Sequence, residues 1–190
     1  MCGIIGIIGK NQASELLIDG LRRLEYRGYD STGIATVDDG ILNRRRASGK
    51  IINLEKEIFK KPISGTMGIG HTRWATHGVP SENNAHPHMT EKVAVVHNGI
   101  IENYRELADS LGLKPSDMES ETDTEIIVHL LTQKLNDGKT PLQSVQEILP
   151  QLKGAFALCM IFSGHNNTMI GARVGSCLLY TSDAADDTDS

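Results

Sequence analysis

The order of strand-like and helix-like segments is the feature that most constrains the fold of this 190-residue chain. Strands are predicted over residues 4–8, 67–74, 93–96, 155–162 and 168–172, and a hairpin is predicted over 33–37 and 41–45, closed by Asp38-Asp39-Gly40. Helices are predicted over 12–24, with Asn11 as N-cap, and over 51–60, 102–111, 123–136 and 141–149. This order of elements is typical of an α+β fold or a layered sandwich.

The composition argues against several classes of protein. No apolar run approaches the ~20 residues needed to cross a bilayer, and the apolar start MCGIIGIIGK has no basic segment before it, so we expect a strand there and not a secretion signal. The net charge is -5, and it falls to -1 without the four aspartates of residues 177–190. Because no basic stripe is present, we expect no nucleic-acid partner, and the run Arg44-Arg45-Arg46 is interpreted as a solvated strand end.

Three cysteines, one of them at position 2, do not indicate a disulfide framework. A cytoplasmic location and no membrane partner are therefore expected, and a reduced Cys2 can stay reactive. If Met1 is removed, Cys2 becomes the first residue and carries its own base, because an α-amino group ordinarily titrates near pKa ~8. That amine can take the thiol proton and later return one to a leaving ammonia. The other interpretation is a second residue that only packs.

Amide hydrolysis by a thiol passes through a tetrahedral oxyanion, which needs hydrogen-bond donors. Asn98 and Gly99 follow the strand predicted over 93–96, so a side-chain amide and a glycine N–H could serve one oxygen. An ordinary Asn-Gly turn is the other interpretation of this pair.

A free amino acid must also be held by its charged groups. Arg73 could bind an α-carboxylate with two parallel hydrogen bonds, with Thr76 and His77 completing the contact. Asp123 could pair with an α-ammonium, although Thr122 or Asp123 could instead simply begin a helix. A metal site is a further alternative raised by the histidines, disfavoured because tight ligand spacing is lacking: His71, His77, His86, His88 and His97.

Six motifs in order make a specific set: MCGI at 1–4, RRLEYRGYDSTG at 22–33, HTRWATHG at 71–78, NAHPH at 84–88, HNGIIENY at 97–104 and SETDTE at 120–125. Over about residues 1–176 the chain closely resembles the glutaminase domain of the glutamine–fructose-6-phosphate aminotransferases (isomerizing), which are class II, N-terminal-nucleophile amidotransferases. Amidophosphoribosyltransferase is the closest rival, sharing the terminal cysteine and the fold.

The resemblance implies an N-terminal-nucleophile hydrolase fold, a four-layer αββα sandwich. It places Cys2 as nucleophile and Asn98 and Gly99 as the oxyanion hole. It assigns glutamine binding to Arg73, Thr76, His77 and Asp123. Trp74 and His86 match positions at the gate between glutaminase and synthase sites, and Arg27 matches a position near the nucleophile.

The family hydrolyses L-glutamine to glutamate through a thioester, without a metal or organic cofactor. Its ammonia passes to a second domain, absent from this chain, where fructose 6-phosphate is converted to glucosamine 6-phosphate. Full-length members are expected to be homo-oligomers. A fragment that binds glutamine without turning it over is the non-catalytic alternative.

The resemblance ends at about residue 176. The family's domain continues there with further sheet, so residues 1–176 are expected to be a C-terminally truncated domain. Residues 177–190 read CLLYTSDAADDTDS, which resembles a translated sequencing adapter, and are expected to be a non-native tail.

Overall fold

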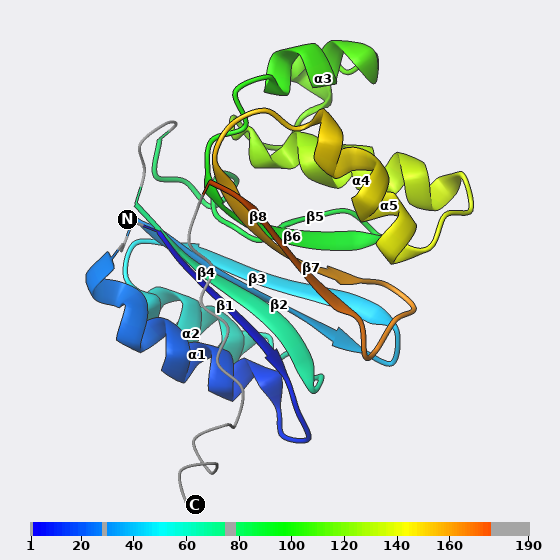
Figure 1. Ribbon diagram of the computed structural model, residues 1–190. Coiled ribbons are helices and arrows are strands. Elements are labelled where there is room, and N and C mark those ends of the chain that lie inside the picture. The colour runs from blue at the N-terminus through cyan, green and yellow to red at the C-terminus, as the bar shows by residue number, and fades with distance from the viewer. Residues whose placement is uncertain (1, 28–29, 75–78, 176–190) are drawn as a thin grey trace, which may run out of the picture.

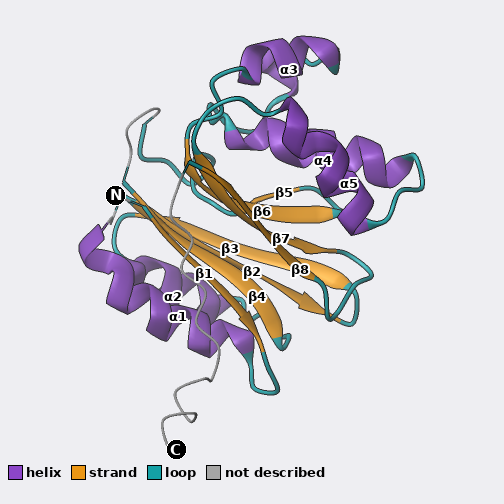
Figure 2. Cartoon of the chain, viewed as in Figure 1, coloured by secondary structure: helices purple, strands orange, loops and turns teal. Residues whose placement is uncertain are grey.

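The computed structural model describes residues 2–27, 30–74 and 79–175, and of Arg27 only the backbone (Figure 1). Two four-stranded antiparallel sheets face each other, and helices cover the outer face of each. The four layers, coloured by element type in Figure 2, confirm the predicted αββα sandwich.

The first sheet has the strand order β1-β4-β2-β3. Its strands are β1 (Gly3–Ile8), β2 (Ser31–Asp38), β3 (Ile41–Ser48) and β4 (Met67–Arg73), and η1 (Glu25–Arg27), α1 (Ala13–Leu24) and α2 (Ile51–Lys60) complete this half. The predicted hairpin is confirmed as the β2–β3 pair, whose turn places Asp39 and Gly40 at φ 47° and 77°. Glycine and aspartate tolerate this left-handed conformation better than most residues.

The second sheet has the strand order β5-β6-β7-β8. Its strands are β5 (His88–Met89), β6 (Val93–Gly99), β7 (Phe156–Phe162) and β8 (Met169–Val174). The helices of this half are α3 (Tyr104–Ser110), η2 (Pro115–Asp117), α4 (Thr124–Asn136), α5 (Pro141–Ile148) and η3 (Leu149–Gln151). The Thr140 side chain accepts a hydrogen bond from the Gln143 N–H, and this N-cap fixes the start of α5.

Three clusters of buried apolar side chains hold the layers together. One packs α1 and α2 on the first sheet, a second fills the space between the sheets, and a third packs α3–α5 on the second sheet. Alternate residues of one strand enter different clusters: Val93 and Val95 face the helices, while Ala94 and Val96 face the other sheet. This alternation fixes which polar residues at the strand ends point between the sheets.

Several sequence-based expectations need correction. Gln12, not Asn11, occupies the N-cap of α1, and the Ala13 N–H there donates to the backbone of Gly65, so a neighbouring turn replaces a side-chain cap. The strand predicted over 93–96 continues through Gly99, because pairing with β7 extends that far. The short strand β5 was not predicted, because two residues carry too little pattern to distinguish from loop.

The arginine run of β3 is not simply solvated, so that interpretation was wrong. Arg46 is buried and donates to the Glu119 carboxylate at 2.7 Å and to the carbonyls of Asn83 and Ala85. Arg44 also bonds Glu119, at 3.2 Å. These bonds tie β3 to the loop that precedes β5 and to the segment that precedes α4.

Candidate active site

Alternation along the strands brings the polar residues together at one end of the sandwich. In β4, Met67 and Ile69 face the second sheet, so His71 and Arg73 continue that face. In β6, Asn98 continues the face of Val96, which lines the same space. Cys2 precedes β1, whose Gly3 pairs with Thr72 of β4, so the thiol lies next to the end of β4.

The Cys2 thiol is held by the backbone of Trp74. The Trp74 N–H donates to Cys2 Sγ at 3.3 Å, and the S–H donates to the Trp74 carbonyl at 3.7 Å. The Cys2 side chain is partly exposed, so a substrate can reach the sulfur.

Asn98 lies between the nucleophile and a buried histidine. Its side-chain amide Nδ2 donates to the Cys2 carbonyl at 3.2 Å, and its Oδ1 lies 2.9 Å from His71 Nε2. Gly99 has a φ of 127°, and an added Cβ would lie 2.1 Å from the Ala155 carbonyl oxygen. Only glycine fits this position, so the Asn-Gly pair is a constrained strand end and not an ordinary turn.

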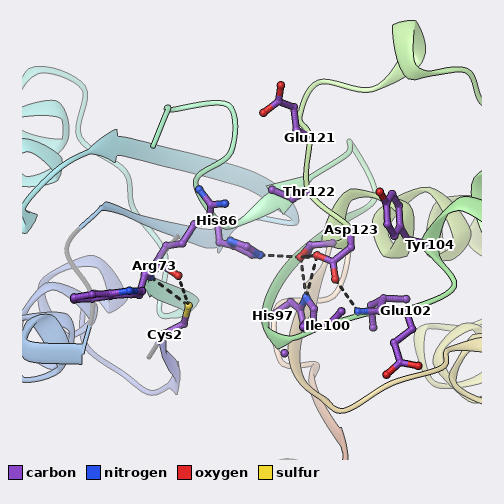
Figure 3. Close-up of a pocket in the computed structure, with 14 residues that line it drawn as sticks. Cys2, Arg73, His86, His97, Ile100, Glu102, Tyr104, Glu121, Thr122 and Asp123 are labelled. Carbon is purple, nitrogen blue, oxygen red and sulfur yellow. Dashed lines mark hydrogen bonds and ion pairs between the residues drawn. The ribbon is translucent and has the colours of Figure 1, made fainter. Parts of the chain in front are cut away.

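A pocket of about 380 Å³ opens beside the thiol, a volume suited to a small ligand (Figure 3). Cys2 and Arg73 lie on one side of it, and Asp123 and His97 on the other. Its full lining is Cys2, Arg73, Trp74, His86, His97, Gly99, Ile100, Ile101, Glu102, Tyr104, Glu121, Thr122, Asp123 and Thr124. A cation and an anion across one cavity match the two charged groups of a free amino acid.

Asp123 is positioned by the loop that follows β6. It occupies the N-cap position of α4 without a side-chain cap bond. Its Oδ2 instead accepts the Ile101 N–H at 2.7 Å, while Oδ1 lies 3.8 Å from His97 Nδ1. Asp123 therefore does stand at the start of a helix, as the alternative interpretation expected, but its carboxylate does not cap that helix.

Four buried histidines cluster at the pocket, and two of them, His86 and His97, line it. The His71 and His86 rings lie 4.3 Å apart, and those of His86 and His88 lie 4.7 Å apart. Thr124 Oγ1 links two of them, at 2.9 Å from His86 Nε2 and 2.8 Å from His97 Nδ1. This hydroxyl connects the Asp123 side of the pocket to the His86 side.

Burial keeps these imidazoles uncharged. It lowers the pKa of His71 and of His88 to about 3, and it lowers the pKa of His86 well below 6.5. The pKa of His97 is also lowered by burial, although the Asp123 carboxylate acts in the opposite direction. Each ring therefore carries one N–H at neutral pH. Among the described residues, no group of three or more His, Cys, Asp or Glu side chains has the arrangement of a metal site.

Most residues predicted for the site come together. Cys2, Arg73, Trp74, His86, Gly99 and Asp123 line the pocket, and Asn98 contacts Cys2. Thr76, His77 and the side chain of Arg27 lie outside the described residues. Within the described ranges, no helix is long and apolar enough to cross a membrane.

Comparison with known proteins identifies the family. A glutamine amidotransferase domain matches residues 71–188, more than half of the chain. The chain belongs to the glutamine amidotransferase domain family. Because that match includes most of residues 177–190, the boundary predicted at residue 176 stays a prediction.

Several curated relatives of this amidotransferase domain carry the same enzyme name. Glutamine–fructose-6-phosphate aminotransferases (isomerizing) of Brucella abortus and Bradyrhizobium diazoefficiens are each 58% identical over 175 residues, which is 92% of this chain. The enzyme of Zymomonas mobilis is 55% identical over 179 residues. The chain spans 29% to 30% of the length of these relatives.

Two solved structures share the fold of this chain. The glutamine phosphoribosylpyrophosphate amidotransferase of B. subtilis superposes with a TM-score of 0.76 at 26% identity, over 91% of this chain and 37% of its own. An allosteric regulatory enzyme of purine biosynthesis gives 0.73 at 27% identity, over 85% of this chain and 35% of its own. The phosphoribosylpyrophosphate amidotransferase, the rival considered from the sequence, is thus less similar to this chain in sequence than the aminotransferases are, although it shares the fold.

Sequence reasoning missed three polar contributors. His71 and His97 entered only as possible metal ligands, and Thr124 was not singled out at all. The spacing of His71 and Arg73 was a usable signal, since residues two apart on a strand share a face. Nothing local to Thr124 indicated that two histidines from other segments would meet at its hydroxyl.

Proposed function

We propose that this chain hydrolyses L-glutamine to glutamate and ammonia, with the Cys2 thiol as nucleophile after removal of Met1. The observation that carries the proposal is the contact of Asn98 Nδ2 with the Cys2 carbonyl at 3.2 Å, at the edge of the pocket. This contact places an amide donor beside a thiol that also receives the Trp74 N–H at 3.3 Å. Cys2, which precedes β1 of the first sheet, thus contacts Asn98 of the second sheet, and these two residues are the proposed nucleophile and oxyanion donor.

The reaction follows from these groups. The α-amine of Cys2 takes the thiol proton, and sulfur attacks the side-chain amide carbon of glutamine. The oxygen of that amide becomes an oxyanion, for which Asn98 Nδ2 and the Gly99 N–H are the donors. Collapse of the intermediate breaks the C–N bond, and the protonated α-amine returns its proton to the leaving ammonia. Water then attacks the thioester, releasing glutamate and the thiol.

Two charged residues would orient the substrate. Arg73 binds the α-carboxylate and Asp123 the α-ammonium, in keeping with their places across the pocket (Figure 3). Oδ2 of Asp123 accepts the Ile101 N–H, and Oδ1, which also accepts a long hydrogen bond of 3.4 Å from Thr124 Oγ1, is the oxygen proposed to bind the α-ammonium. Thr76 and His77 are proposed to complete the contact with the carboxylate.

The relatives, which are longer than this chain, suggest what happens to the ammonia released from glutamine. We propose that the whole protein containing this domain is a glutamine–fructose-6-phosphate aminotransferase, so that ammonia released here would aminate fructose 6-phosphate in a second domain. Trp74, whose side chain is 45% exposed at the pocket, and His86 are proposed to control passage between the two sites, with Arg27 supporting the nucleophile. A homo-oligomeric cytoplasmic enzyme without cofactor completes the proposal.

Glutamate release from L-glutamine by the purified chain tests the proposal, together with intact mass to verify loss of Met1. Cys2→Ala should abolish release. Cys159→Ala is the matched control and should retain it, because Cys159 is buried between the sheets away from the pocket. Turnover that survived Cys2→Ala would exclude the thiol mechanism. An inactive wild-type chain stabilised by glutamine would indicate binding alone.

A further inference from the structure

We propose that His71 is a positioning residue that selects the catalytically competent orientation of the Asn98 amide. This inference rests on the proposed glutamine hydrolysis, since it explains how one donor of the oxyanion hole is oriented. His71 lies in β4 of the first sheet and Asn98 in β6 of the second, so their contact at 2.9 Å bridges the sandwich next to the nucleophile.

The orientation of the Asn98 amide follows from its two neighbours. The Cys2 carbonyl can only accept a hydrogen bond, so the group 3.2 Å from it must be the NH₂ end of the amide. The oxygen end then faces His71 Nε2. Since an amide oxygen only accepts, Nε2 must carry the proton of the neutral imidazole. The geometry therefore assigns His71 to the Nε2–H tautomer.

The consequence for catalysis lies in the second hydrogen of Asn98 Nδ2. One hydrogen is used by the Cys2 carbonyl, which leaves the other for the oxyanion. If the amide turned over, Oδ1 would face the Cys2 carbonyl and the oxyanion, and two repulsive contacts would replace two hydrogen bonds. The His71 N–H opposes this turn because it would then face an NH₂ group.

The surroundings of His71 keep it in this role. The side chain is 1% exposed, and its ring lies against that of His86 with centroids 4.3 Å apart. Burial favours the neutral ring, which has a single N–H to place. A charged imidazolium would donate from both nitrogens and would specify no tautomer.

The test combines steady-state kinetics with a double-mutant cycle. His71→Phe keeps an aromatic ring but removes the donor. It should lower kcat about 10-fold or more, by less than Asn98→Ala, and change KM by less than about 3-fold, because an oxyanion donor acts in the transition state. In the Asn98→Ala background the same substitution should change kcat by less than about 2-fold, since its target is gone. Equal losses in both backgrounds would overturn the proposal.

Two further variants separate positioning from folding. His71→Gln retains an N–H donor and should recover part of the kcat lost in His71→Phe, and it serves as the test if the phenylalanine variant does not fold. His88→Phe removes a buried ring of the same cluster that bonds Thr122 and not Asn98. Its effect on kcat should be equal in the wild-type and Asn98→Ala backgrounds.

A spectroscopic measurement is independent of turnover. Long-range ¹H–¹⁵N correlation spectra of the wild-type chain should show His71 with a protonated Nε2 and an unprotonated Nδ1 at neutral pH. The opposite tautomer would overturn the inference even in an active enzyme. A wild-type chain that released no glutamate, yet showed the expected tautomer, would contradict the proposed hydrolysis and leave the assigned amide orientation supported.

Discussion

The Asp123 carboxylate and the Ile101 backbone N–H are joined by a 2.7 Å hydrogen bond, which fixes the acidic side of the pocket relative to the end of β6. Ile101 is fully buried, so its N–H has no access to solvent as a substitute. One side chain therefore has two separable tasks, an internal hydrogen bond through Oδ2 and a charge presented to the pocket.

Asp123→Asn should separate these tasks. The asparagine oxygen can still accept the Ile101 N–H, so the melting temperature should change little. Loss of the negative charge should raise KM for glutamine about 10-fold to 100-fold, since a charge-assisted hydrogen bond contributes roughly 1.5–3 kcal/mol. Steady-state kinetics and thermal melts measure both effects.

Asp123→Ala should additionally lose about 1–3 kcal/mol of stability, because the Ile101 N–H is left unpaired. An unchanged KM in both variants would remove Asp123 from the substrate site.

Gly99→Ala should inactivate the chain or prevent it from folding. The new Cβ would lie 2.1 Å from the Ala155 carbonyl oxygen, and φ is 127°. Because β6 and β7 are paired there, relief of the clash would displace the strand that carries Asn98. Gly138→Ala is the matched control, since φ is 82° and no atom lies within 4 Å of the added Cβ. We expect it to cost about 1 kcal/mol of stability and to leave glutamate release unchanged. Similar melting temperatures and rates for the two variants would contradict the steric argument.

Local pattern predicted most of the helices and strands and part of the site. Apolar runs and the Asp38-Asp39-Gly40 turn predicted the strands, because period and turn chemistry are properties of neighbouring residues. The family motifs then indicated Cys2, Asn98 and Asp123. What local pattern did not show were contacts across the sheets, such as His71 with Asn98, which depend on how two separately predicted strands face each other.

The arginines of β3 show the same limit. A run of three basic residues gives no local sign that Arg46 is buried, since its partner Glu119 lies 73 residues further along the chain. The prediction of Asn11 as the N-cap of α1 was wrong for a related reason. Its helix start is satisfied by the Gly65 carbonyl from another part of the chain, so a capping side chain is not required.

Acidification should destabilise the fold through the buried histidines. The pKa values of His71 and His88 are about 3 in the folded chain, below the 6.5 of an unperturbed histidine. The unfolded chain therefore binds more protons between these values, and the free energy of unfolding falls as the pH drops from 6.5 toward 3. Above pH 6.5 this contribution is fully present. Denaturant melts at several pH values measure the slope.

Part of the pH dependence of the free energy of unfolding can be assigned to the His88 ring. His88→Gln should reduce the proton uptake on unfolding between pH 6 and 4 by about one. Thr122→Val removes the hydrogen-bond partner of His88 at 2.9 Å without removing a titratable group, so it should lower stability but keep the slope. Equal slopes for wild type and His88→Gln would show that this histidine does not titrate on unfolding in that range.

Thiol reactivity should distinguish Cys2 from Cys159 in the native chain. Cys2 is partly exposed beside the pocket, whereas Cys159 is 7% exposed and burial raises the pKa of its thiol to about 12. Because the thiolate is the reactive form, iodoacetamide at pH 7.5 should modify Cys2 and spare Cys159. Peptide mass spectrometry locates the label, and Cys2→Ala serves as the control. Glutamine should slow labelling of Cys2 if substrate occupies the adjoining pocket. Rapid labelling of Cys159 in the folded chain would mean that the space between the sheets opens readily, since that thiol has no other route to the reagent.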